Sequence, residues 1–152
     1  MHVTMTSAGT ADWEKPVQIG TNQWRANYKT YLVTRFKTAA GQQVYVKTRY
    51  SGVDEIVLDG TVTGGFGHLE GQDQDGDWMF GRVDWEVRGD YEGGIYTFLG
   101  GTGKWEGSSG VLKAPVWAVP EDHDQAMPPT TPIRFYGFIE GEGELELPGF
   151  AS

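Results

Sequence analysis

The sequence predicts an all-β protein, a small eight-stranded antiparallel β-barrel. Three observations support this fold class. Several segments alternate apolar and polar residues with the two-residue period of a half-buried strand. Glycine accounts for 23 of 152 residues and aromatic residues for 13%, a composition typical of many short strands joined by turns. No segment sustains the 3.6-residue apolar period of an amphipathic helix. A barrel is favoured over an open sheet because closure removes strand edges that would otherwise pair with other chains.

The length is that of a single domain, which we expect to span residues 13–150. Residues 1–12 are rich in Thr, Ser, Gly and Ala, and we expect them to form a flexible N-terminal extension. Residues 27–37 and 43–50 alternate clearly and form a predicted hairpin around residues 39–41. The strands expected along the chain are residues 13–20, 27–37, 43–50, 55–63, 68–71, 78–88, 94–99, 111–117 and 133–147.

The long connection of residues 119–132 is acidic and rich in proline, which disfavours burial. We expect it to be a mobile flap near one mouth of the barrel. The turn at residues 73–77 is different, because Asp-Gly is a strong hairpin signal. Its Asp73, Asp75 and Asp77 imitate the start of a calcium loop, but Trp78 stands where such a loop needs glycine, so a plain turn is favoured.

Charge and composition narrow the function classes. The formal net charge is −9 and no basic stripe is visible, which argues against a nucleic-acid partner. The chain has no cysteine, and its three histidines are too dispersed for a zinc motif, so we expect no metal and no cofactor. Neither a signal peptide nor a membrane-spanning apolar run is apparent, so no membrane association and a cytoplasmic location are expected.

Residues 100–107 read Gly-Gly-Thr-Gly-Lys-Trp-Glu-Gly and join two strand-like segments. This motif resembles the allene oxide cyclase and dirigent β-barrel superfamily. The resemblance extends over about the C-terminal half, through the Phe-Gly step at residues 80–81, the aromatic strand at 133–141 and the tail at 144–149. It implies a barrel with an apolar cavity, cyclase-type chemistry without a cofactor, and a trimer. The chain lacks the cavity cysteine of the plant cyclases, so allene oxide itself is not the expected substrate.

The strand at residues 78–88 carries the most organised charge. Its alternating positions divide into a set with Arg82, Asp84 and Glu86 and a set with Met79, Val83 and Trp85. Either the charged set faces water over an apolar core, or it lines the cavity between aromatic rings. On the second alternative, Asp84 is the preferred acid–base group, with Glu86 and Arg82 as partners. The rings expected to bind substrate are those of Trp78, Phe80, Tyr45, Phe98, Trp105 and Phe135.

The function expected is therefore that of a cyclase, isomerase or lyase acting on a hydrophobic small molecule inside the barrel. A dirigent-like or lipocalin-like binding protein without chemistry of its own is the first alternative. A structural subunit that uses its outer aromatic residues is the second. Because rings such as Tyr136 and Phe138 occupy a second face of the last strand, we also expect a homo-oligomer, most simply a trimer.

Overall fold

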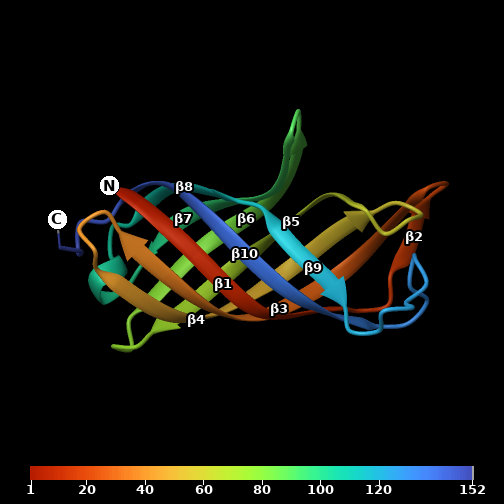
Figure 1. Cartoon of the computed structure of the whole chain (residues 1–152), viewed down its shortest axis with the longest axis horizontal. Coiled ribbons are helices and arrows are strands. Elements are labelled where there is room, and N and C mark those ends of the chain that lie inside the picture. Colours follow the sequence, from red (N-terminus) through yellow and green to blue (C-terminus); the bar gives the residue numbers. More distant parts are fainter. Residues whose placement is uncertain (152) are drawn as a thin grey trace.

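Antiparallel strands that run obliquely to the long axis of the molecule form a closed barrel in the computed structural model, which describes residues 1–151 (Figure 1). Eight strands close the barrel, and β2 and β9 are additional, which confirms the predicted fold class. The elements are β1 (His2–Trp13), β2 (Val17–Gly20), β3 (Gln23–Thr38), β4 (Gln43–Ile56), β5 (Val62–Asp73), β6 (Trp78–Arg88), β7 (Tyr91–Gly101), the short 3₁₀ helix η1 (Gly103–Trp105), β8 (Ser109–Ala114), β9 (Val116–Pro120) and β10 (Ile133–Glu146).

The N-terminal segment differs from the expectation of a flexible extension. It forms β1, which pairs with β10 on one side and with β3 on the other, and so closes the barrel. Val3, Met5 and Ser7 point inward and are buried. The small side chains of this segment carry little apolar period, so its composition resembles that of a frayed end. Pairing on both sides supplies the stability that local propensity does not indicate.

Burial alternates residue by residue along β3 and β4, as the sequence pattern predicts. The inward positions of β3 are Ala26, Tyr28, Thr30, Leu32, Thr34, Phe36 and Thr38. Three of the buried hydroxyl groups form a chain across the interior: the oxygens of Ser7 and Thr34 are 2.7 Å apart, and those of Thr34 and Thr48 are 3.0 Å apart. Thr48 then donates to the Leu32 carbonyl, so these buried polar groups are satisfied.

Two strands are longer than the sequence indicated. β4 continues through Gly52 to Ile56, across residues 51–54 where the prediction placed a break. The strand expected at residues 55–63 is wrong, because residues 57–61 form the turn before β5, and β5 passes through Gly64, Gly65 and Gly67. At Gly52 a β-carbon would collide with the carbonyl oxygen of Phe66 on the neighbouring strand. Glycine therefore permits close contact between paired strands here, and does not mark a turn.

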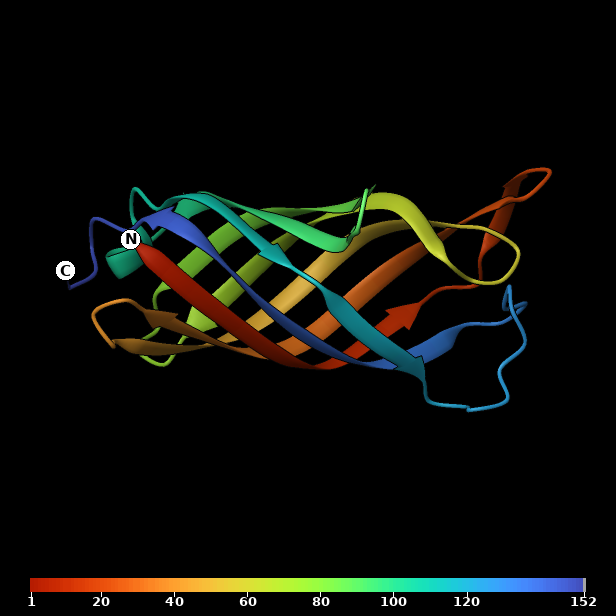
Figure 2. The same ribbon diagram turned by 45° about the horizontal axis from the view of Figure 1, so that its top comes forward.

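One end of the barrel, at the left in Figures 1 and 2, is closed by η1 and the C-terminal segment. Trp105 of η1 is 1% exposed and packs edge-on against Phe36 and Phe150, at centroid distances of 5.5 and 4.8 Å. The corner at residues 100–107 thus places a plugging ring inside the barrel end. Within residues 1–151, no helix has the length and apolar character needed to cross a bilayer.

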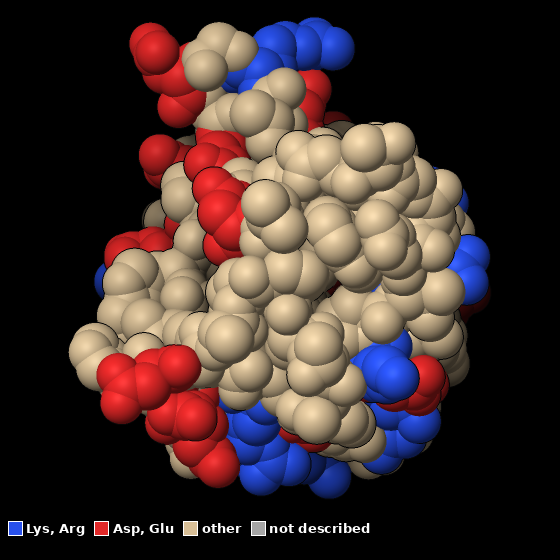
Figure 3. Space-filling view, turned by 90° about the vertical axis from the view of Figure 1, so that its right-hand side faces the viewer, with Lys and Arg blue, Asp and Glu red and all other residues tan. Residues whose placement is uncertain are grey.

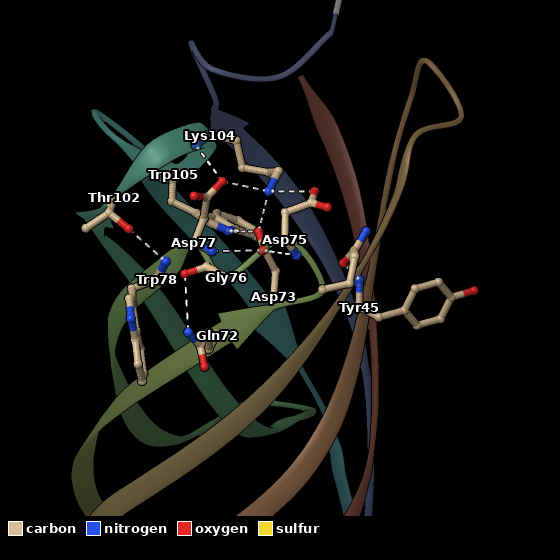
Figure 4. A network of polar contacts seen from close by, with 11 residues as sticks. Tyr45, Gln72, Asp73, Asp75, Gly76, Asp77, Trp78, Thr102, Lys104 and Trp105 are labelled. Carbon is tan, nitrogen blue, oxygen red and sulfur yellow. Dashed lines mark hydrogen bonds and ion pairs between the residues drawn. The ribbon is translucent and has the colours of Figure 1, made fainter.

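A polar network fastens this closed end (Figure 4). The Lys104 ammonium lies 2.6 Å from Asp73 Oδ2, 2.8 Å from Asp77 Oδ2 and 3.2 Å from Asp75 Oδ2. The indole of Trp105 donates to Asp73 Oδ2 at 2.9 Å, and Asp73 Oδ1 accepts the backbone N–H groups of Asp75 and Asp77. The predicted turn is present, and an ammonium group occupies the position between the carboxylates that a cation would take in a metal loop.

Candidate functional site

The opposite end of the barrel contains an internal cavity of about 290 Å³. It opens toward the face seen in Figure 3, where uncharged residues cover most of the surface and acidic side chains gather along one side. Its walls are mainly aromatic and aliphatic side chains from seven barrel strands, joined by β9. Among them are Trp13, Val83, Val116, Phe135 and Ile139. An apolar, concave space with few polar groups is the usual form of a small-molecule site.

Of the carboxylates that line this cavity, Asp54 is the most buried. It lies on β4 at an inward position, four residues after the buried Tyr50, and its Oδ2 accepts a hydrogen bond of 2.8 Å from Trp13 Nε1. Part of its surface faces the cavity, while protein atoms surround it on the other sides. Burial raises the pKa of Asp54 to about 6, and the hydrogen bond from Trp13 only partly offsets this rise.

Three tyrosines share the cavity with Asp54: Tyr28 on β3, Tyr50 on β4 and Tyr96 on β7. The rings of Tyr50 and Tyr96 meet edge to face with centroids 5.9 Å apart. Burial raises the pKa of all three hydroxyls above the ordinary value, and the negative charge of Asp54 raises that of Tyr28 further. These phenols therefore stay protonated at neutral pH and can serve as hydrogen-bond donors to a ligand.

Gly67 on β5 determines where the Tyr28 hydroxyl lies. A β-carbon at Gly67 would collide with that hydroxyl oxygen.

We therefore expect Gly67→Ala to lower the free energy of unfolding by about 1–3 kcal/mol, the usual cost of overpacking a core. Urea unfolding measures this loss. In the Tyr28→Phe background the cost should be smaller, because the hydroxyl is gone and the closest remaining atom is the Ser51 carbonyl oxygen at 2.9 Å. Equal losses in both backgrounds would show that this carbonyl, and not the hydroxyl, limits the space at Gly67. Gly137→Ala is the control, since its β-carbon would meet nothing closer than 3.7 Å.

The loop between β4 and β5 lies at the mouth of the cavity. Gly60, between β4 and β5, lines the cavity and packs against Met127 of the long connection that follows β9. The connection thus lies at one mouth of the barrel, where the sequence analysis expected it, although its first two residues, Val119 and Pro120, belong to β9. Trp85 extends the wall near this rim and donates a 3.1 Å hydrogen bond to the Val62 carbonyl.

The three residues expected to be catalytic lie outside this cavity. Arg82 and Asp84 project from the outer wall of β6 and form a bidentate ion pair, with 2.9 Å between Nη2 and Oδ1 and 2.9 Å between Nε and Oδ2. Their side chains are 41% and 43% exposed. Glu86 lies nearer the projecting end of β6, 3.5 Å from Arg88. The charged set of this strand therefore faces solvent, and Met79 and Val83 face the core.

The six rings expected to bind substrate divide between the two sides of the wall. Trp78, Phe80 and Tyr45 lie on the outer surface, at 37%, 42% and 49% exposure. Phe98 and Trp105 are interior, but they belong to the plug at the closed end. Of the six, Phe135 lines the cavity, where its ring packs on Trp13 with centroids 4.6 Å apart.

Asp54 and Tyr28 were not among the site residues predicted from the sequence. The signal for Asp54 was its parity, because Val44, Val46, Thr48 and Tyr50 share its side of the strand. Because Gly52 was interpreted as a break in the strand, Asp54 was not assigned to the same strand as these residues. Tyr28 likewise shares the inward parity of β3 with Leu32 and Phe36.

The described residues, 1–151, contain no group of three or more His, Cys, Asp or Glu side chains arranged to hold a metal ion. Comparison with known proteins adds no relative: no family model, curated protein or solved structure matches this chain. The resemblance to the allene oxide cyclase and dirigent superfamily accordingly remains a prediction from the sequence motif.

Proposed function

We propose that this protein binds an uncharged, hydrophobic small molecule in the open end of its barrel and catalyses a proton-transfer reaction on it, an isomerisation or cyclisation without a cofactor. The observation that carries the proposal is Asp54, a carboxylate in an apolar cavity with its pKa raised to about 6. A group with this pKa exists in both protonation states near neutral pH, as general acid–base catalysis requires.

The cavity supplies the other conditions for such a reaction. At about 290 Å³ it lies just below the usual size range of small-molecule sites, roughly 300–1,000 Å³, and so suits a small ligand. Its largely apolar walls replace water around much of a bound molecule, which strengthens polar interactions at the reacting atoms. Tyr28 is influenced electrostatically by Asp54 and keeps its proton. In the proposed reaction Asp54 removes or returns a proton on carbon while Tyr28 donates a hydrogen bond to the oxygen that gains charge.

Ligand binding is tested first, with the uncharged fluorophore N-phenyl-1-naphthylamine. Its emission should rise on entering the apolar cavity, and Val116→Trp, which fills the cavity from β9, should abolish the rise. Val111→Trp is the matched control, because Val111 lies on the outer wall of β8 and is 42% exposed. No rise with the natural protein, or an equal rise in all three, would contradict a site inside the barrel.

The chemistry is tested by solvent exchange. Small hydrophobic ketones and enones that displace the fluorophore are incubated with the protein in deuterium oxide, and deuterium uptake at carbon is followed by mass spectrometry. We expect uptake that depends on the protein and on an unblocked cavity. Displacement without exchange in any ligand would favour the binding protein that the sequence analysis kept as its alternative.

A further inference from the structure

The outer wall around β1 carries two stripes of opposite charge. Glu140, Glu142 and Glu144 project outward from β10, on one side of β1. Arg35 and Lys37 project outward from β3, on the other side. Within residues 1–151, neither Arg35 nor Lys37 nor Glu140 takes part in an ion pair. This wall, made of the outward residues of β10, β1 and β3, is called the β1 face below.

The strand register places these charges in matched rows across β1. Glu142, Thr4 and Lys37 form one row, and Glu140, Thr6 and Arg35 form the next. In each row an acid and a base stand on opposite sides of a threonine, two strand spacings apart, about 9.6 Å. Within residues 1–151 no ion pair joins Glu140 or Glu142 to Arg35 or Lys37, and Glu142 Oε2 instead contacts His2 Nε2 at 2.8 Å.

The next two rows of the β1 face are apolar. Phe138, Ala8 and Val33 form one, and Tyr136, Thr10 and Tyr31 form the other. Val33 is 62% exposed, Tyr136 49%, Tyr31 47% and Phe138 40%. Exposed apolar side chains gathered on one wall and flanked by charge are typical of a protein–protein contact.

We propose that two copies of this chain dimerise through the β1 face, related by a two-fold axis that runs along β1 in the plane of the contact. This rotation places β10 of each copy opposite β3 of the other, and each row faces the same row of the second copy. It therefore sets Glu140 of each copy opposite Arg35 of the other, Glu142 opposite Lys37, and Phe138 opposite Val33. Over these four rows the surface is complementary to itself, as a closed two-fold interface requires. The following row, in which Arg134 would face Lys29, lies outside the contact.

A groove beside the β1 face supports a second copy as the occupant. It measures about 440 Å³ and lies on the outer wall, where the small residues Ala8 and Gly9 of β1 meet Val33, Lys47 and Arg49. Trp117, 60% exposed, lies on β9 in the same row as Phe138, and Lys47 lies in the row of Val33. Trp117 and Lys47 lie two strands from β1, where the barrel wall curves away, so the same rotation places them at the rim of the contact.

Charge exchange tests this dimer. The first variant carries Glu140→Lys and Glu142→Lys, and the second carries Arg35→Glu and Lys37→Glu. All four side chains are exposed, so both variants should fold. We expect the natural protein to sediment as a dimer at micromolar concentration and each variant alone to be a monomer. An equimolar mixture of the two variants should again form dimers, because each rotated pair then joins opposite charges.

Asp90→Lys with Glu106→Lys is the matched control, since it makes the same change of charge on exposed turns away from the β1 face and should remain dimeric. A monomeric or trimeric natural protein would overturn the proposal. Variants that stay dimeric alone, or a mixture that stays monomeric, would also overturn it. None of these results bears on the cavity, whose ligand binding is measured separately.

Discussion

Replacing Lys104 by methionine is expected to lower the free energy of unfolding by about 3–5 kcal/mol, the range found when one partner of a buried ion pair is removed. The side chain of Asp73 has no exposed surface, and Lys104 is the cation within 4.0 Å of it. Methionine keeps much of the apolar stem but leaves Asp73 charged and uncompensated, beside the carboxylates of Asp75 and Asp77. The hydrogen bonds from Trp105 and from the backbone N–H groups of Asp75 and Asp77 remain, but they supply no positive charge.

Urea unfolding at neutral pH measures this loss. Lys15→Met is the matched control, because Lys15 is exposed and its substitution should change stability by about 0.5 kcal/mol or less. Adding Asp73→Asn to Lys104→Met should recover part of the stability, since no buried charge then remains. If Lys104→Met is as stable as the control, the network does not hold the closed end of the barrel.

The same network predicts how the free energy of unfolding depends on pH. Burial would raise the pKa of Asp73, but hydrogen bonds from Lys104, Trp105 and two backbone N–H groups outweigh this, so its pKa lies below the usual value. The stability that Asp73 contributes is therefore present above the unfolded pKa of about 4 and is lost as the pH falls toward the folded one. Lys104→Met should remove this contribution.

Replacing Asp54 by asparagine is expected to separate stability from activity. Asparagine preserves the shape and can still accept the hydrogen bond from Trp13, but it cannot exchange a proton. We expect deuterium exchange into a bound ligand to fall by about a hundredfold or more, as the loss of a general acid–base group does, while fluorophore binding is retained. Glu55→Gln, at the next, outward position of β4, is the matched control and should keep full exchange.

The Asp54→Asn variant should also be more stable at neutral pH, by up to about 3 kcal/mol for a pKa raised from 3.8 to about 6. The folded state holds this proton more tightly than the unfolded state, so stability falls as the pH rises from about 4 to about 6. The gain should thus be small near pH 4 and constant above about pH 7. A variant less stable than the natural protein at neutral pH would show that Asp54 is not destabilised by burial.

The fold could be predicted because its strands alternate over many residues. Burial along β3 and β6 follows the parity visible in the sequence. The inward-facing side of β6 was harder to predict, because both sides carry large apolar residues. Trp78 and Phe80 lie on one side, and Met79 and Trp85 lie on the other. That choice depends on packing against β5 and β7, which a single strand does not reveal.

The two polar sites depend on contacts distant in sequence, and the sequence analysis found neither. Trp13 and Asp54 are separated by 41 positions and meet because β1 and β4 both pair with β3. Asp73 was correctly placed in a turn, but its ammonium partner lies 31 positions away. Composition also gave a wrong prediction for β1, because its small residues are typical of a disordered end. The segment forms a strand because it pairs with β3 and β10.

The closure of the barrel by β1 has a consequence for its synthesis on the ribosome. Asp12 and Arg134, which pair across β1 and β10, are 122 positions apart. Until β10 has left the exit tunnel, the nascent sheet has two free edges, at β1 and β8, whose backbone groups can pair with other chains. Folding is then completed by the most sequence-distant pairing in the molecule, so translation of the last strand, and not of the first, ends the period of aggregation risk.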